Sequence, residues 1–166
     1  DSLRYARPTL PTALFAAASA GHAPVVKALL VRGADPEIPN PERRTAMLVA
    51  ADQGHADVVI ALSDAGADPN KPGVYRQTAL HLAAWQGHVE TSRALIDRGA
   101  DTEARDMTGA TPLALAASEH VPAIIELLLA AGADPTTCND EGWSPAEIAD
   151  AHDLPDIAAR IRAAVS

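Results

Sequence analysis

Six histidines are the residues of this chain best suited to metal binding or to acid–base chemistry. Three of them, His22, His55 and His88, each follow a glycine and stand 33 residues apart. A regular spacing of this length indicates a repeated structural role, so we interpret these three as framework residues and not as ligands. His120 and His152 have no partner at the spacing that zinc ligands show. The sequence therefore predicts no metal site.

Cys138 and His152 are the one pair that could supply a nucleophile and a base. Cys138 is the single cysteine of the chain. The sequence offers no third group to orient the histidine and no glycine-rich turn to stabilise an oxyanion, so we interpret Cys138 as an ordinary surface thiol. It also contains no phosphate-binding loop and no serine nucleophile elbow. We therefore expect no catalytic residues, no cofactor and no enzyme activity.

The spacing of the histidines belongs to a longer repeat. A threonine opens four consecutive copies, and a serine takes its place in the fifth, at intervals of 33 residues: Thr12, Thr45, Thr78, Thr111 and Ser144. A Gly-Ala-Asp phrase keeps the same interval, beginning at Gly33, Gly66, Gly99 and Gly132. A fixed period of this length is typical of a repeat array. We therefore expect units that begin near residues 12, 45, 78, 111 and 144.

Each unit has the pattern of two short amphipathic helices. After Thr78, whose hydroxyl can cap the first helix, Leu80 and Ala83 lie on one helical face, and Leu95 lies on the apolar face of the second. Gly99 suits a left-handed helix end. One such pair is too small to bury its own apolar face, so stacking of the pairs must supply the core. Small residues at equivalent places would let neighbouring helices approach closely, namely Ala17, Ala50, Ala83 and Ala116.

The unit that begins Thr78-Ala79-Leu80-His81-Leu82-Ala83-Ala84, and continues with Gly87-His88 and Gly99-Ala100-Asp101, resembles an ankyrin repeat. The resemblance extends over about residues 10–165. It implies an all-α solenoid of five stacked helix-turn-helix units with short hairpin-like fingers, forming a single domain over residues 1–166. It also implies that His81 makes hydrogen bonds between repeats. Residues 1–11 are expected to be an irregular lead-in, in which Leu3 and Tyr5 cover the open edge of the first unit.

Three local features depart from the ankyrin pattern. The glycine expected two residues before the opening threonine is replaced by Arg43 and Arg76 in two of the units. In the fourth unit, His120 and Val121 stand where Gly-His is expected. Prolines within residues 35–42 and 68–73 remove backbone donors, so we expect the first two fingers to be less regular than the third and fourth.

The composition limits the kinds of partner. The chain has a net charge of −9, and residues 106–159 contain ten acidic residues without a single lysine or arginine. Nucleic-acid binding normally needs the opposite charge, so we do not expect it. No run of 18 or more apolar residues occurs, and no membrane span is expected. A single cysteine leaves the cellular compartment open.

In ankyrin proteins, partners usually bind at the finger tips and at the exposed ends of the first helices, which line the concave side of the solenoid. The resemblance therefore implies a candidate partner-binding set at these places: Tyr75, Gln77, Trp85, Gln86, Met107, Glu119, Asp140, Glu141, Trp143 and His152. Three of the five aromatic residues of the chain fall in this set. Large exposed aromatic side chains are common anchors of protein interfaces.

The predicted function is a non-catalytic protein-binding module that presents a rigid concave surface. We expect a monomer whose protein partner carries a basic patch that faces the acidic C-terminal half. One alternative is a regulatory or targeting domain of a larger enzyme or secreted effector whose catalytic part lies elsewhere. Another alternative is a purely structural spacer.

Overall fold

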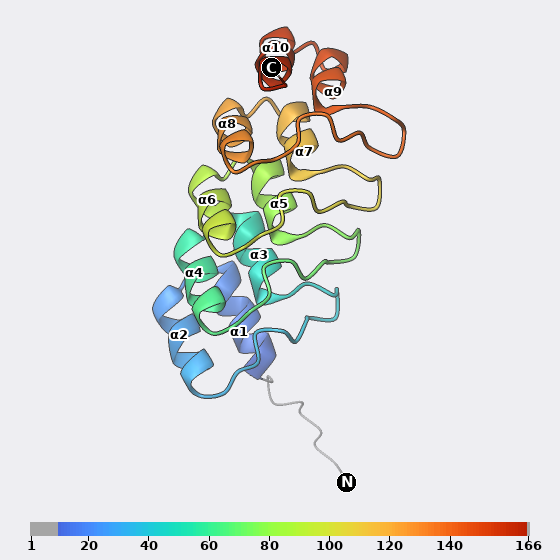
Figure 1. The fold of residues 1–166 in the computed structure, drawn as a ribbon. Helices are drawn as coiled ribbons and strands as arrows, with labels where there is room; N and C mark the ends of the chain where they lie inside the picture. Colours follow the sequence, from blue (N-terminus) through green and yellow to red (C-terminus); the bar gives the residue numbers. More distant parts are fainter. Residues whose placement is uncertain (1–9, 166) are drawn as a thin grey trace.

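The computed structural model describes residues 10–165, which form ten helices in five consecutive pairs (Figure 1). The first helices of the pairs are α1 (Leu10–Ser19), α3 (Ala46–Gln53), α5 (Ala79–Gln86), α7 (Pro112–Ser118) and α9 (Pro145–Ala151). The second helices are α2 (Ala23–Val31), α4 (Ala56–Asp64), α6 (Val89–Asp97), α8 (Pro122–Ala130) and α10 (Pro155–Ala163). This architecture confirms the expected all-α solenoid.

The helices stack in two layers, with the odd-numbered helices in one and the even-numbered helices in the other (Figure 1). Each helix contacts its partner in the pair, and equivalent helices of neighbouring pairs contact each other from α1 to α9 and from α2 to α8. The connections between pairs project as fingers from the side of the odd-numbered layer. We number these fingers 1 to 4, over residues 35–44, 68–77, 101–110 and 134–143.

Thr45, Thr78, Thr111 and Ser144 stand directly before helices, as the repeat predicts, whereas Thr12 lies within α1. The Oγ1 atoms of Thr45 and Thr111 accept the amides of Leu48 and Ala114, each at 3.3 Å. Ser144 and Glu147 form a reciprocal capping box. Such caps satisfy backbone N–H groups that have no partner inside the helix. Pro122 and Pro155 begin α8 and α10, where a missing N–H costs little.

The core lies between the layers and repeats with the sequence. The same place in the first helices of the first four pairs is taken by Leu14, Met47, Leu80 and Leu113, and all four side chains are almost fully buried. In the second helices, Leu62, Leu95 and Leu128 occupy equivalent positions and are fully buried. The four alanines expected at close contacts are buried as well: Ala17, Ala50, Ala83 and Ala116. Since each pair buries its apolar face only against its neighbours, the array supplies its own core.

Histidines of the Gly-His positions join one pair to the preceding pair. The Nε2 atom of His55 lies 3.1 Å from the carbonyl oxygen of Ser19, and that of His88 lies 3.0 Å from the carbonyl oxygen of Asp52. A Cβ atom added to Gly54 would meet the ring of His88 at 2.7 Å, so this glycine makes room for the histidine of the next unit. The interpretation of the repeated histidines as framework residues is consistent with these contacts.

The fingers share one turn geometry. In each finger an amide bonds to a carbonyl four residues later, as from Asn139 to Trp143 and from Gly73 to Gln77, both at 2.9 Å. Arg43 and Arg76 adopt the left-handed backbone, with φ of 60° and 57°, where Gly109 and Gly142 stand in the later fingers. The expected irregularity of the first two fingers is therefore wrong at their tips.

The position of Pro41 explains why the turn of finger 1 tolerates a proline. Met107 and Asp140 donate their amides to the preceding finger, to the carbonyl oxygens of Tyr75 and Thr108, each at 2.9 Å. Pro41 is the equivalent residue of finger 1, which has no earlier finger in the described chain to which it could donate. The loss of this donor therefore leaves the turn unchanged.

The expected lead-in overlaps the first helix, because α1 begins at Leu10. The predicted positions of Leu3 and Tyr5 lie outside the described residues. No helix of the described chain combines the length and the apolar character that a bilayer span needs.

Candidate functional site

The predicted partner-binding residues lie on the surface formed by the fingers and by the C-terminal ends of the odd-numbered helices. We call this surface the finger face. Its large side chains are well exposed: Tyr75 at 60%, Met107 at 57%, Trp85 at 46% and Trp143 at 44%. These aromatic rings therefore do not simply fill gaps between the units. Most of the predicted residues gather around two separate pockets.

The first pocket, which we call the α3–α5 pocket, has a volume of about 340 Å³. Leu48 and Leu82 form its apolar lining, and Tyr75, Gln77 and Trp85 are the predicted residues that line it. The polar side chains of Glu42, Arg44 and Asp52 complete the wall. An apolar lining with a few convergent polar groups is the usual character of a binding pocket.

Asp52 organises the polar wall of the α3–α5 pocket. Its carboxylate accepts a hydrogen bond from Arg44 Nη2 at 2.7 Å and another from Gln86 Nε2 at 3.0 Å. Burial raises the pKa of Asp52, but the hydrogen bonds from Gln86 and Arg44 and the charge of Arg44 outweigh it, so the pKa lies below its usual value. Gln86, a predicted partner-binding residue, thus fixes Asp52 and is not among the residues that line the pocket.

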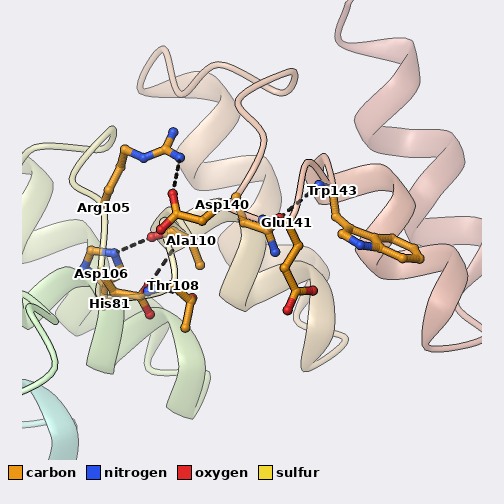
Figure 2. Close-up of polar contacts among 9 residues, drawn as sticks. His81, Arg105, Asp106, Thr108, Ala110, Asp140, Glu141 and Trp143 are labelled. Atoms are coloured by element: carbon orange, nitrogen blue, oxygen red, sulfur yellow. Dashed lines mark hydrogen bonds and ion pairs between the residues drawn. The ribbon is translucent and has the colours of Figure 1, made fainter.

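The second pocket, the α7–α9 pocket, has a volume of about 350 Å³. It lies between the end of α7, finger 4 and α9, and three predicted residues line it: Glu141, Trp143 and His152. Leu115 and Ile148 form part of the apolar lining. Figure 2 shows the indole of Trp143 on the side of the C-terminal helices, with Glu141 between it and the Asp140 side chain.

Asp140 does not line the α7–α9 pocket, since it is engaged by finger 3. Arg105 Nη2 lies 3.2 Å from Asp140 Oδ1, and the backbone amide of Asp140 bonds to the carbonyl oxygen of Thr108 (Figure 2). We expected a negative rim of Glu119, Asp140 and Glu141. The positive charge of Arg105, from the preceding finger, partly neutralises it at Asp140. Sequence reasoning did not foresee this pair, because the two residues are 35 positions apart and only the stacked fingers bring them together.

A side chain within the finger holds the tip in place in fingers 1, 3 and 4, whereas finger 2 has Gly73 at the equivalent position. Asn139 Oδ1 accepts the amides of Glu141 at 3.1 Å and of Trp143 at 2.9 Å. Asp106 Oδ1 does the same in finger 3, accepting the amides of Thr108 at 2.8 Å and Ala110 at 3.0 Å. Since the backbone donors are satisfied inside the finger, the exposed side chains project from a fixed turn.

Besides Gln86 and Asp140, two further predicted residues line neither pocket. Met107 is exposed at the tip of finger 3, between the two pockets along the array, and Glu119 is exposed directly after α7. Glu119 follows Ser118, which does line the α7–α9 pocket. Leu48 and Leu82, which sequence reasoning assigned to no site, contribute to the α3–α5 pocket.

Cys138 and His152, the pair considered for chemistry, share no hydrogen bond in the described chain. Cys138 is exposed in finger 4, and its Sγ lies 3.5 Å from the carbonyl oxygen of Thr136. His152 lines the α7–α9 pocket, which does not include Cys138. Within residues 10–165, no three histidine, cysteine or acidic side chains are grouped so that they could hold a metal ion.

A family model described as ankyrin repeats (3 copies) matches residues 6–73 and 65–139. The matched residues include the first four helix pairs up to the base of finger 4. The fifth pair, α9 and α10, follows the matched region and packs on α7 in the same two layers. No curated protein matches the chain.

Proposed function

The chain belongs to the ankyrin-repeat family, and from that premise we propose that its finger face binds a protein partner without catalysing a reaction. Ankyrin repeats are generally protein–protein interaction modules. The proposal assigns the binding role to the predicted residues that surround the two pockets. Its anchors are Tyr75 and Trp85 at the α3–α5 pocket and Trp143 at the α7–α9 pocket.

The observation that carries the proposal is the position of the aromatic side chains. Tyr75, Trp85 and Trp143 are all exposed, and each lines a pocket of the finger face. Aromatic residues beside pockets are the usual energetic centres of protein interfaces. The even-numbered layer, in contrast, exposes aliphatic residues such as Val31 and Ile60 but no aromatic side chain within the described chain.

The connections between fingers support a rigid binding surface. Fingers 2, 3 and 4 are joined by backbone hydrogen bonds at their tips. Side chains tie finger bases together with the same 33-residue period: Glu37, Asn70 and Glu103 accept the amides of Asp68, Asp101 and Asp134, each at 2.8 Å. A preformed surface loses little conformational entropy on association, which favours binding.

The charge of the molecule favours a protein with a basic surface over a nucleic acid. The net charge is −9, and phosphate backbones bind to lysine and arginine clusters. A basic protein surface would meet the acidic C-terminal half with complementary charge, which speeds association. We propose that the domain acts as a monomer in this complex.

Two steps test this proposal: the partner is captured, and its affinity is then compared for wild type and Trp85→Ala. The purified domain is immobilised, the bound proteins are identified by mass spectrometry, and each is then produced separately for affinity measurement. Truncation of an interface anchor costs about 2 kcal/mol or more, so Trp85→Ala is expected to weaken binding at least roughly tenfold. The fold should remain intact, because Trp85 is half exposed.

Arg93→Ala, on the exposed face of α6, is the matched control and should bind as wild type does. Circular dichroism melts of both variants verify the fold. Binding that survives Trp85→Ala but disappears in Arg93→Ala would show that the partner uses the even-numbered layer, and the proposal would be rejected.

A further inference from the structure

We propose that the α7–α9 pocket receives the guanidinium group of an arginine side chain from the partner. This proposal rests on the proposed protein-binding function and assigns one pocket to one chemical group. Three observations support it: the hydrogen-bond acceptors that remain free in the pocket, the indole of Trp143, and the negative charge around the pocket.

The hydroxyl groups of the pocket have already used their protons. Thr108 Oγ1 donates to the carboxylate of Asp106 at 2.7 Å, and Ser118 Oγ donates to the carbonyl oxygen of Leu115 at 2.8 Å. A carboxylate and a carbonyl oxygen can only accept, so both hydroxyl oxygens have only lone pairs left for a ligand. These two residues therefore favour a ligand group that donates hydrogen bonds.

Glu141 adds an acceptor that carries a full charge. Its side chain lines the pocket and forms no ion pair with any described residue, unlike its neighbour Asp140. An apolar ligand that filled the pocket would remove water from this carboxylate without replacing its hydrogen bonds, which is costly. A cationic donor would instead form a charge-assisted hydrogen bond with it.

The surrounding charge has the same sign. No lysine or arginine occurs within residues 106–159. Glu119 directly follows the lining residue Ser118, and Asp153 directly follows His152, and both acidic residues are exposed. A cation that enters this pocket meets no lysine or arginine of finger 4, α7 or α9, and His152 is the one histidine that lines it. The α3–α5 pocket differs, because Arg44 lies in its wall.

Trp143 distinguishes a guanidinium from an ammonium group. A planar guanidinium stacks on an indole face and directs five N–H donors outward in its own plane. Thr108, Ser118 and Glu141 offer acceptors from three segments around the pocket. Asn139 uses its oxygen within finger 4, so its amide nitrogen remains a donor for the peptide carbonyl beside the arginine. A lysine ammonium matches this arrangement less well, since it has three donors and no flat face.

The test uses three capped peptides of six identical residues: arginine, lysine and citrulline. Citrulline keeps the shape of arginine but carries no charge. Binding to the intact domain is measured by isothermal titration at low ionic strength. We expect hexa-arginine to bind more tightly than hexa-lysine, and hexa-citrulline not to bind.

Variants then locate the site. The loss of a cation–π contact of about 1 kcal/mol corresponds to about fivefold, so Trp143→Ala should weaken hexa-arginine binding by about that factor. Glu141→Gln, which keeps the shape of the side chain, should weaken it similarly. Asp156→Asn is the matched control, since it removes one exposed acidic charge of α10 that does not line the pocket. It should change the affinity by less than about twofold.

Several results would overturn the proposal. These are equal binding by Trp143→Ala and wild type, an equal loss in Asp156→Asn and Glu141→Gln, tight binding of hexa-citrulline, or no binding of hexa-arginine. If Trp143→Ala does not fold, as judged by circular dichroism, Glu141→Gln decides the question. A protein partner that depends on Trp85 while hexa-arginine fails to bind would leave the protein-binding function standing and reject the arginine site alone.

Discussion

At the scale of single residues, His81 is the side chain most tightly specified by its neighbours. Its Nδ1 accepts the backbone amide of Thr78 at 3.1 Å, so this nitrogen carries no proton. Its Nε2 lies 3.1 Å from the carbonyl oxygen of Ala110 and must therefore donate. The ring is fully buried and neutral, and it joins the start of α5 to the end of finger 3. This confirms the bonding role between repeats that the family resemblance implied.

A lower pH should decrease the free energy of unfolding, because the folded protein holds His81 in its neutral form. Burial lowers the pKa of His81 below 6.5, while hydrogen bonding to Ala110 opposes this shift only in part. In the unfolded chain the pKa returns to about 6.5, so below that pH the unfolded state binds a proton that the folded state excludes. The free energy of unfolding should therefore fall as the pH decreases below 6.5, by at most about 1.4 kcal/mol per pH unit from this residue.

Urea denaturation at pH 7.5 and 5.5 measures this effect. His81→Gln, which cannot titrate, should lose less stability between the two pH values than wild type does. His22→Gln is the control, since His22 is exposed and forms no cap hydrogen bond at the start of α2. If His81→Gln and wild type lose the same stability between pH 7.5 and 5.5, His81 does not cause the acid sensitivity.

At the scale of elements, α6 is the least regular member of its layer. Its buried residues Thr91 and Ser92 occupy the places that Val58 and Val59 hold in α4, and their hydroxyl oxygens have no hydrogen-bond partner within the described chain. At the same junction, Val121 replaces the histidine that joins the earlier pairs. Helix α6 therefore buries unpaired polar groups at two positions where α4 and α8 bury valine and isoleucine.

Thr91→Val should stabilise the domain. Valine keeps the shape of threonine and removes a buried hydroxyl without a partner, which costs about 1 to 3 kcal/mol in proteins. We expect the free energy of unfolding to rise by about 1 kcal/mol, measured by urea denaturation. Glu90→Ala, an exposed change on the same helix, should alter it by less than about 0.5 kcal/mol. A lower stability of Thr91→Val would mean that the hydroxyl is satisfied in the folded protein.

The helices were predictable from the sequence because each depends on residues close together in the chain. Thr111, Leu113 and Gly99 take the positions that the 33-residue period predicts, as a cap, a core residue and a left-handed helix end. The aromatic candidates came from the ankyrin resemblance, which points to the fingers for Tyr75 and Trp143 and to the end of a first helix for Trp85. The ion pair between Arg105 and Asp140 was not predictable, since its formation depends on the spacing and tilt of two stacked fingers. The two pockets depend on the same geometry.

At the scale of the whole molecule, the repeat array separates stability from binding. The core lies between the two layers, whereas the exposed aromatic residues and both pockets lie on the finger face. Residues of the finger face can therefore vary without loss of the fold, which suits a surface adapted to one partner. In the proposed complex, the acidic C-terminal half would favour one orientation of a basic partner.

Hydrogen exchange of the backbone amides, measured with and without the captured partner, tests the central claim most directly. The account predicts slower exchange in the complex for residues 74–77, 107–109 and 140–143 and for the C-terminal turn of α5. Helices α2, α4 and α6 should exchange as they do in the free domain. Slower exchange confined to these even-numbered helices, with unchanged finger tips, would contradict the claim that the finger face is the binding surface.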